Sequence, residues 1–147
     1  MSLPKVQLIR QVFPASNRPD PGQALKAELA RTNLLDPVGP GQKVLITAGS
    51  RGIECLGEVL EDMVAAVKER GAQPVIYPAM GSHGGGTASG QPEVLEHMGL
   101  TEAKLNAPIH RELEMVQVAS VHDGVPVYVD RAVAQADHVI LVNRVKE

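Results

Sequence analysis

The stretch from residue 43 to residue 77 constrains the fold more than any other part of this 147-residue chain. Residues 43–47 form a nearly continuous apolar run, which is typical of a strand buried on both faces of a parallel sheet. A glycine-containing turn follows, and apolar residues then recur at helical spacing from Leu56 to Val67. Residues 74–77 form a second apolar run. The stretch therefore predicts a strand, a helix and a parallel strand joined by a right-handed crossover.

Further elements are expected on both sides of this unit. They are a strand over residues 5–13, helices over 24–35 and 92–98, a hairpin of strands 115–121 and 125–129, a helical turn at 132–136 and a buried strand at 138–142. This order predicts one α/β domain over residues 1–147. We expect a mostly parallel sheet with helices on both faces, a three-layer Rossmann-like arrangement, and a β-hairpin insertion.

Composition excludes several classes of function. The hydrophobic content of 44% with a net charge of -3 is that of an ordinary folded domain. Aromatic residues make up only 2%, and no basic cluster is longer than a pair, so nucleic acid is not an expected partner. No apolar run approaches the roughly 20 residues that span a bilayer, and residues 1–13 contain charges. We therefore expect a cytoplasmic protein without a membrane partner.

Three of the expected strands end in a polar or glycine-rich loop. In open α/β sheets, ligands bind at the carboxyl ends of the strands. The first such loop contains Gly49, Ser50, Arg51 and Gly52. Free backbone N–H groups and a guanidinium favour a phosphate or carboxylate, although an ordinary structural turn with a solvated arginine would look the same in sequence. The loop has the spacing of neither a Walker loop nor a dinucleotide fingerprint.

The second loop carries His83, with Gly81, Gly84, Gly85 and Gly86 around it. Glycine allows a ligand to approach the backbone closely, and an imidazole can exchange protons near neutral pH. The alternative is an exposed loop histidine without a function.

The other histidines share no metal-ligand spacing, so we expect surface or capping roles for them and no metal site in this chain. They are His97, His110, His122 and His138.

At these loops the chain resembles the N-terminal part of the lactate racemase family and its uncharacterised relatives. The resemblance rests on residues 46–53, residues 78–88 with Gly90 and Gln91, and residues 136–146. Their order and spacing cover nearly the whole chain.

The resemblance implies a two-domain isomerase that moves a hydride between a 2-hydroxy acid and a nickel-pincer nucleotide. His83 matches the first of the family's two acid/base histidines and would take the hydroxyl proton, with Arg51 as a second catalytic residue that holds an anionic group. The cofactor-binding turn matches Ala48 to Arg51, and we add Gly84 and Gly85 to the cofactor contacts.

Two departures from the family pattern qualify this reading. Ala48 stands where the lactate enzymes carry an aspartate, which favours a different 2-hydroxy acid. The family's second histidine, its cofactor-anchoring lysine and its nickel-binding histidine would lie beyond residue 147. We therefore expect a truncated N-terminal part that is inactive alone and retains no cofactor.

Two other functions fit the same sequence. One is a non-catalytic nucleotide- or phosphate-binding module that uses Arg51 but needs no titrating histidine. The other is a structural domain that associates through its open sheet edge, either with the missing C-terminal part or with a second copy as a homo-oligomer.

Overall fold

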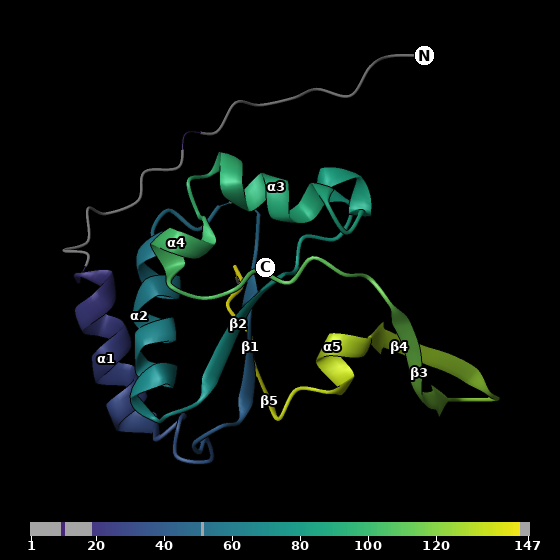
Figure 1. Ribbon diagram of the computed structural model, residues 1–147, viewed down its shortest axis with the longest axis horizontal. Coiled ribbons are helices and arrows are strands. Elements are labelled where there is room, and N and C mark those ends of the chain that lie inside the picture. The colour runs from purple at the N-terminus through teal and green to yellow at the C-terminus, as the bar shows by residue number, and fades with distance from the viewer. Residues whose placement is uncertain (1–9, 11–18, 51, 145–147) are drawn as a thin grey trace.

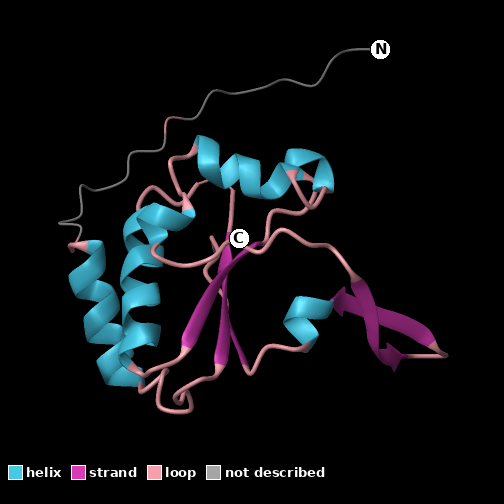
Figure 2. Cartoon of the chain, in the orientation of Figure 1, coloured by secondary structure: helices cyan, strands magenta, loops and turns pink. Residues whose placement is uncertain are grey.

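The computed structural model of the chain describes residues 10, 19–50 and 52–144. Except for Arg10, the strand expected over residues 5–13 lies outside the described residues, and so does Arg51. The described part is an α/β fold in which a parallel sheet, flanked by helices, stands beside an antiparallel hairpin (Figures 1 and 2).

The parallel sheet has three strands in the order β2-β1-β5. They are β1 (Lys43–Ala48), β2 (Gln73–Pro78) and β5 (His138–Ile140). The central strand β1 pairs in parallel with β2 through Lys43 to Ala48 and with β5 through Val44 to Ile46. The expected parallel arrangement of the first two apolar runs is confirmed, and the three strands present their carboxyl ends at the same edge.

Helix α2 (Leu56–Glu69) packs against this sheet with the apolar stripe that the sequence predicts. Leu60 and Val67 are completely buried, and Gly71 follows the helix end with a φ of +74° that suits glycine. Helix α1 (Pro21–Thr32) lies alongside α2 (Figure 1). It starts earlier than expected because Asp20 caps it, accepting a hydrogen bond from the Gln23 backbone N–H at 2.8 Å.

The chain between β2 and the hairpin contains three short helical elements. They are η1 (His83–Gly86), α3 (Gly90–His97) and α4 (Glu102–Leu105). Helix α3 begins two residues before the expected Pro92, and α4 was not expected. After α4, residues 108–110 extend the sheet past β2: the Ile76 N–H donates to the Pro108 carbonyl at 2.9 Å, and the His110 N–H donates to the Ile76 carbonyl at 2.8 Å.

The expected hairpin is confirmed as β3 (Met115–Val121) and β4 (Val125–Asp130). Its turn places His122, Asp123 and Gly124 at positive φ. The hairpin points away from the parallel sheet, and the four-residue helix α5 (Arg131–Ala134) leads back from it to β5 (Figure 1).

The main apolar core lies on the face of the sheet covered by α2. Val44, Ile46 and Ala48 of β1 belong to it. Leu45 faces the opposite side next to Val139, which remains 40% exposed. In the part of the chain that the structure describes, α1 and α2 lie on the same side, so the expected three-layer arrangement is not confirmed. No helix in that part is long and apolar enough to cross a bilayer.

Candidate functional site

Two loops meet at the carboxyl edge of the parallel sheet. Ser50 follows β1, and His83 follows β2 at the start of η1. Their side chains are in contact, with Ser50 Oγ hydrogen-bonded to His83 Nδ1, and both residues are half-buried. The sequence predicted that both loops carry site residues, and the structure brings these two together.

The contact with Ser50 determines what the His83 imidazole can do. If Nδ1 carries the hydrogen and donates to Oγ, the lone pair of Nε2 is free to accept a proton from a ligand. In the opposite arrangement the hydroxyl donates to Nδ1, and Nε2 presents an N–H. Either way Nε2 is the ring nitrogen left for a ligand, and its role as donor or acceptor is the opposite of that of Nδ1.

The glycines around His83 are required by the backbone. Gly84 has a φ of +61° and lies directly against the backbone of Gly90, so that a side chain at either position would overlap the other. Thr87 links the same two residues, since its hydroxyl donates to the Gly84 carbonyl and accepts from the Gly90 N–H, each at 3.0 Å. The Gln91 side chain donates to the Gly81 carbonyl at 2.7 Å. These contacts fix the loop that carries His83.

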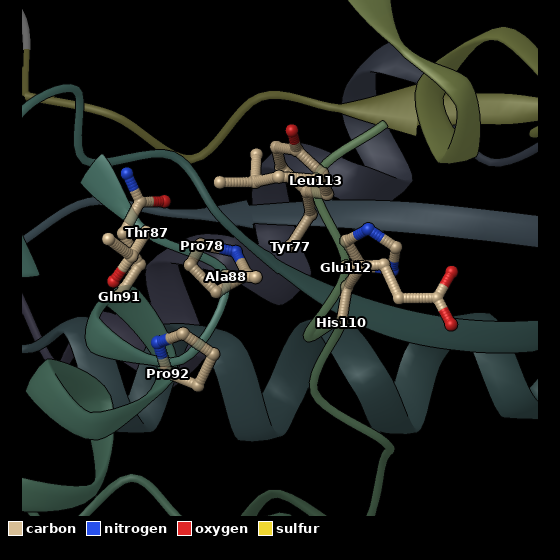
Figure 3. A pocket seen from close by; sticks show the side chains of 9 residues that line it. All are labelled: Tyr77, Pro78, Thr87, Ala88, Gln91, Pro92, His110, Glu112 and Leu113. Carbon is tan, nitrogen blue, oxygen red and sulfur yellow. The ribbon is translucent and has the colours of Figure 1, made fainter. Parts of the chain in front are cut away.

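A narrow hollow behind this loop holds no more than a water-sized group. Its volume is about 10 Å³, and Tyr77, Thr87, Gln91 and His110 are among the residues that line it (Figure 3). Thr87 and Gln91 are already engaged within the loop. The hollow is therefore part of the packing that supports the loop and is too small for a substrate.

A third loop, after β5, adds a cation that the sequence analysis did not single out. Arg144 lies against the turn after β1: a Cβ at Gly52 would be 2.6 Å from its Nη1. Asn143 approaches Gly49 in the same way, with its Oδ1 3.7 Å from a Cβ placed there. Only their position after the strand expected at 138–142 could have indicated these residues. That strand was expected to be buried, but Val139 is 40% exposed.

Arg144 differs from most of the other arginines that the structure describes. Four of those pair with carboxylates: Arg31 with Glu28, Arg70 with Asp36, Arg111 with Glu96, and Arg131 with Glu114. Across residues 10, 19–50 and 52–144, Arg144 has no carboxylate partner. A guanidinium without a carboxylate partner favours an anionic ligand.

The remaining predicted site residues fall in different environments. Ala48 is fully buried, its side chain packs in the core, and its carbonyl accepts from the Ala79 N–H at 2.9 Å. Gly84 and Gly85 lie in the loop of His83. Helix α2 begins at Leu56, beyond Ile53 and a turn, so its N-terminus does not directly follow Gly52 as expected.

The expectation of a surface or capping role is wrong for His110. Its side chain is 14% exposed, and its ring stacks on Tyr77 with the centroids 5.3 Å apart. Its Nε2 is 3.5 Å from Oδ1 of the Asp130 carboxylate. Burial, and secondly the negative charge of Asp130, raise the pKa of Tyr77 above its ordinary value. The sequence could not reveal this cluster because its members are far apart in the chain.

The described residues do not match the metal that the family resemblance implies. Within them, no group of three or more His, Cys, Asp or Glu side chains could hold a metal ion. What they offer is a hydrogen-bonded imidazole, an unpaired guanidinium and backbone turns, which suit the anionic and hydroxyl groups of a ligand.

Comparison with known proteins yields no matching family model, no matching curated protein and no matching solved structure.

Proposed function

We propose that this chain is the N-terminal portion of a cytoplasmic 2-hydroxy acid racemase or epimerase of the lactate racemase type, with His83 as an acid/base group. The hydrogen bond between Ser50 and His83 is the observation that carries the proposal. The full three-layer Rossmann-like arrangement and the use of a nickel-pincer nucleotide belong to the same proposal. Within the described residues no group of three or more potential metal ligands is present, and we assign these residues substrate binding and proton transfer.

The chemistry assigned to these residues is limited to the substrate's hydroxyl and carboxylate. With Ser50 Oγ accepting the hydrogen of Nδ1, Nε2 of His83 takes the hydroxyl proton as the α-carbon is oxidised and returns it afterwards. Arg144 holds the carboxylate, as Arg51 would in the resemblance. A 2-hydroxy acid carries both groups on adjacent carbons, so the proposal requires Nε2 of His83 and the guanidinium of Arg144 to reach the same small molecule.

Two measurements test the proposal. In the first, this chain is titrated with glycolate, D-lactate, L-lactate and malate while the ¹⁵N shift of His83 Nε2 is followed by NMR. We expect a saturable shift that Arg144→Ala weakens about tenfold or more, as for the loss of a charged hydrogen-bond partner. Formate, acetate and sulfate serve as probes for simple anion binding.

In the second measurement, the protein that contains this chain is supplied with cofactor and assayed for racemisation. Replacement of a general base typically costs about 10²–10⁴-fold in rate, so we expect a loss of that size for His83→Ala. His97→Ala, on the exposed end of α3, is the control. An unchanged rate for His83→Ala would remove the proposed base.

Anion binding without catalysis is the second candidate function, and the guanidinium of Arg144, which has no carboxylate partner among the described residues, favours it. A phosphate- or nucleotide-binding module would bind inorganic phosphate or a mononucleotide equally well after His83→Ala, whereas Arg144→Ala would abolish binding. Retention of phosphate binding together with the absence of any response to 2-hydroxy acids would favour this module over the racemase.

A further inference from the structure

Thr47 is the next-to-last residue of β1, and it is buried although its side chain is polar. The last pair of residues in the ladder between β1 and β5 joins Ile46 with Ile140. Beyond that pair, the Thr47 hydroxyl accepts from the Val142 N–H at 2.9 Å and donates to the Val142 carbonyl at 3.3 Å. This side chain therefore continues the attachment of the chain to β1 where the backbone pairing has ended.

The two hydrogen bonds fix the direction in which the backbone of residue 142 faces. One hydroxyl can make both, because it has one hydrogen to donate and lone pairs that accept. The Val142 side chain also packs against the main core. Apolar packing has little directional preference, whereas a hydrogen bond weakens steeply as its angle departs from linear. We therefore attribute the orientation of the chain that follows β5 to Thr47.

The side chain that this orientation places is that of Arg144, two residues further on. A Cβ at Gly52 would be 2.6 Å from its Nη1 and 3.0 Å from its Cδ, so the arginine lies directly over this glycine. Gly52 has a φ of +77°, and glycine supplies both the backbone conformation and the space. Between the two anchored residues, Asn143 Oδ1 accepts from the Arg144 N–H at 2.8 Å, which restricts the short link further.

An arginine that is already placed binds a ligand at a lower cost. Arg144 is exposed, and an exposed side chain loses rotamer freedom when it holds a ligand. We propose that Thr47 is a positioning residue: by holding Val142 against β1, its hydroxyl places the Arg144 guanidinium over Gly52, at the carboxyl edge of the sheet. Its contribution to ligand binding rests on the proposed function, in which Arg144 holds the carboxylate.

Thr47 acts through Val142 and not by direct contact with a ligand. Across the residues that the structure describes, both hydrogen bonds of the hydroxyl go to the backbone of Val142. Its only hydrogen is used in one of them, and the residue is 7% exposed. Removal of the hydroxyl should therefore change the position of Arg144 and leave the chemical groups of the site intact.

The first test measures the placement of Arg144 without a ligand. In NMR spectra of this chain we expect a nuclear Overhauser effect between the δ-CH₂ of Arg144 and the α-CH₂ of Gly52. Thr47→Val keeps the shape of the side chain but removes the hydroxyl, and should abolish this signal, whereas Thr47→Ser should retain it. Val67→Ala, in the buried face of α2, lowers stability elsewhere and should also retain it. Persistence of the signal in Thr47→Val, or its loss from folded Val67→Ala, overturns the proposal.

The second test measures whether the placement matters for binding. Sulfate and L-lactate are titrated into the same variants. We expect Thr47→Val to lower the affinity roughly three- to tenfold, as for the loss of a neutral hydrogen bond, and Thr47→Ser to restore it. Equal affinities in Thr47→Val and the parent chain would show that Thr47 stabilises the sheet without positioning the guanidinium for a ligand. A parent chain that binds no anion refutes the role of Arg144 in the proposed function, and loss of the Overhauser signal in Thr47→Val would still support Thr47 as the residue that places it.

Two glycine variants test the placement from the opposite side. Gly52→Ala puts a methyl group where Arg144 lies. Gly41→Ala is the matched control, because Gly41 has the same φ of +77° but nothing lies within 4 Å of the added Cβ. We expect sulfate affinity to fall in Gly52→Ala by as much as in Thr47→Val, and to stay unchanged in Gly41→Ala. Full affinity in Gly52→Ala would show that the guanidinium binds equally well from another position, and overturns the proposal.

Discussion

The strands of the parallel sheet and those of the hairpin are built from similar residues, yet their burial is opposite. In β1, Leu45 and Ile46 are completely buried. In β3, Val118 and Val121 are 50% and 49% exposed. The central strand has a neighbour on each side and a helix across one face, whereas the hairpin strands contact mainly each other and α5.

This difference shows that an apolar strand sequence predicts a strand but does not predict what covers it. The hairpin register places Val116 opposite Val129 and Val121 opposite Val125. On β4 the two valines are four residues apart and so lie on one face. On β3 the register shift between Gln117 and Ala119 brings Val116 and Val121 to that same face. Their contribution to stability should be much smaller than that of the sheet core, since the hydrophobic contribution scales with the area removed from water.

The largest effect is expected in the central strand. Ile46→Ala removes a fully buried side chain between β2, β5 and α2, and should lower the free energy of unfolding by about 2–5 kcal/mol. Urea unfolding followed by circular dichroism measures it. A loss below about 1 kcal/mol would mean that the core collapses around the cavity, and the contrast with the hairpin would fail.

An intermediate effect is expected in the loop that extends from β2. Gly84→Ala forces a left-handed backbone on a residue with a side chain, at roughly 1–3 kcal/mol, and also drives a methyl group into the Gly90 backbone.

Gly81→Ala is the matched control for this variant. Gly81 has nearly the same φ, +60°, but nothing lies within 4 Å of the added Cβ. Gly84→Ala should therefore be the less stable of the two in urea unfolding, and it alone should disturb the His83 ring signals. Equal losses of stability in the two variants would show that the Gly90 backbone moves away from the added methyl group at no cost in free energy.

A pH-dependent effect on stability is expected at Tyr77, where the parallel sheet meets the hairpin. Because the folded state raises the pKa of Tyr77, the neutral phenol is favoured on folding. That contribution is present below the ordinary tyrosine pKa of 10.0 and is lost as the pH rises through the higher folded value.

Substitution of tyrosine by phenylalanine isolates this contribution. Tyr77→Phe should flatten the decline in thermal stability above pH 10, the ordinary value for tyrosine. Tyr128→Phe, in the exposed part of β4, should leave the decline as steep as in the parent chain. If Tyr128→Phe flattened this decline and Tyr77→Phe did not, the decline would not come from the raised pKa of Tyr77.

The smallest effect is expected in the hairpin. Val121→Ala should change the free energy of unfolding by no more than about 0.5 kcal/mol, because the side chain is already half exposed. A loss close to that of Ile46→Ala, together with a dependence on protein concentration, would show that the apolar face is covered by a second copy.

Local patterns in the sequence were sufficient to predict β1, α2, β2 and the hairpin, because each depends on short-range periodicity or turn chemistry. The short helix α4 was missed because four residues carry too little periodicity. The pairing of residues 108–110 with β2 was missed because this segment has no strand pattern of its own.

The site could be predicted in part. Ser50 and His83 were identified because both follow apolar strands, whose parallel pairing brings their ends together. Arg144 and the buried pair of His110 and Asp130 depend on contacts between distant parts of the chain, and no local pattern encodes such contacts. Arg51 lies outside the described residues, so its proposed role stays a prediction.

The pairing of β1 with β5 has a consequence for how the chain acquires its structure during synthesis. Val44 pairs with His138, so the middle strand has one unpaired side until nearly a hundred further residues have been translated. At about 5–20 residues per second this takes several seconds. During that interval, β1, α2 and β2 can assemble as they leave the ribosome, and the exposed edge of β1 is open to wrong pairing with other nascent chains.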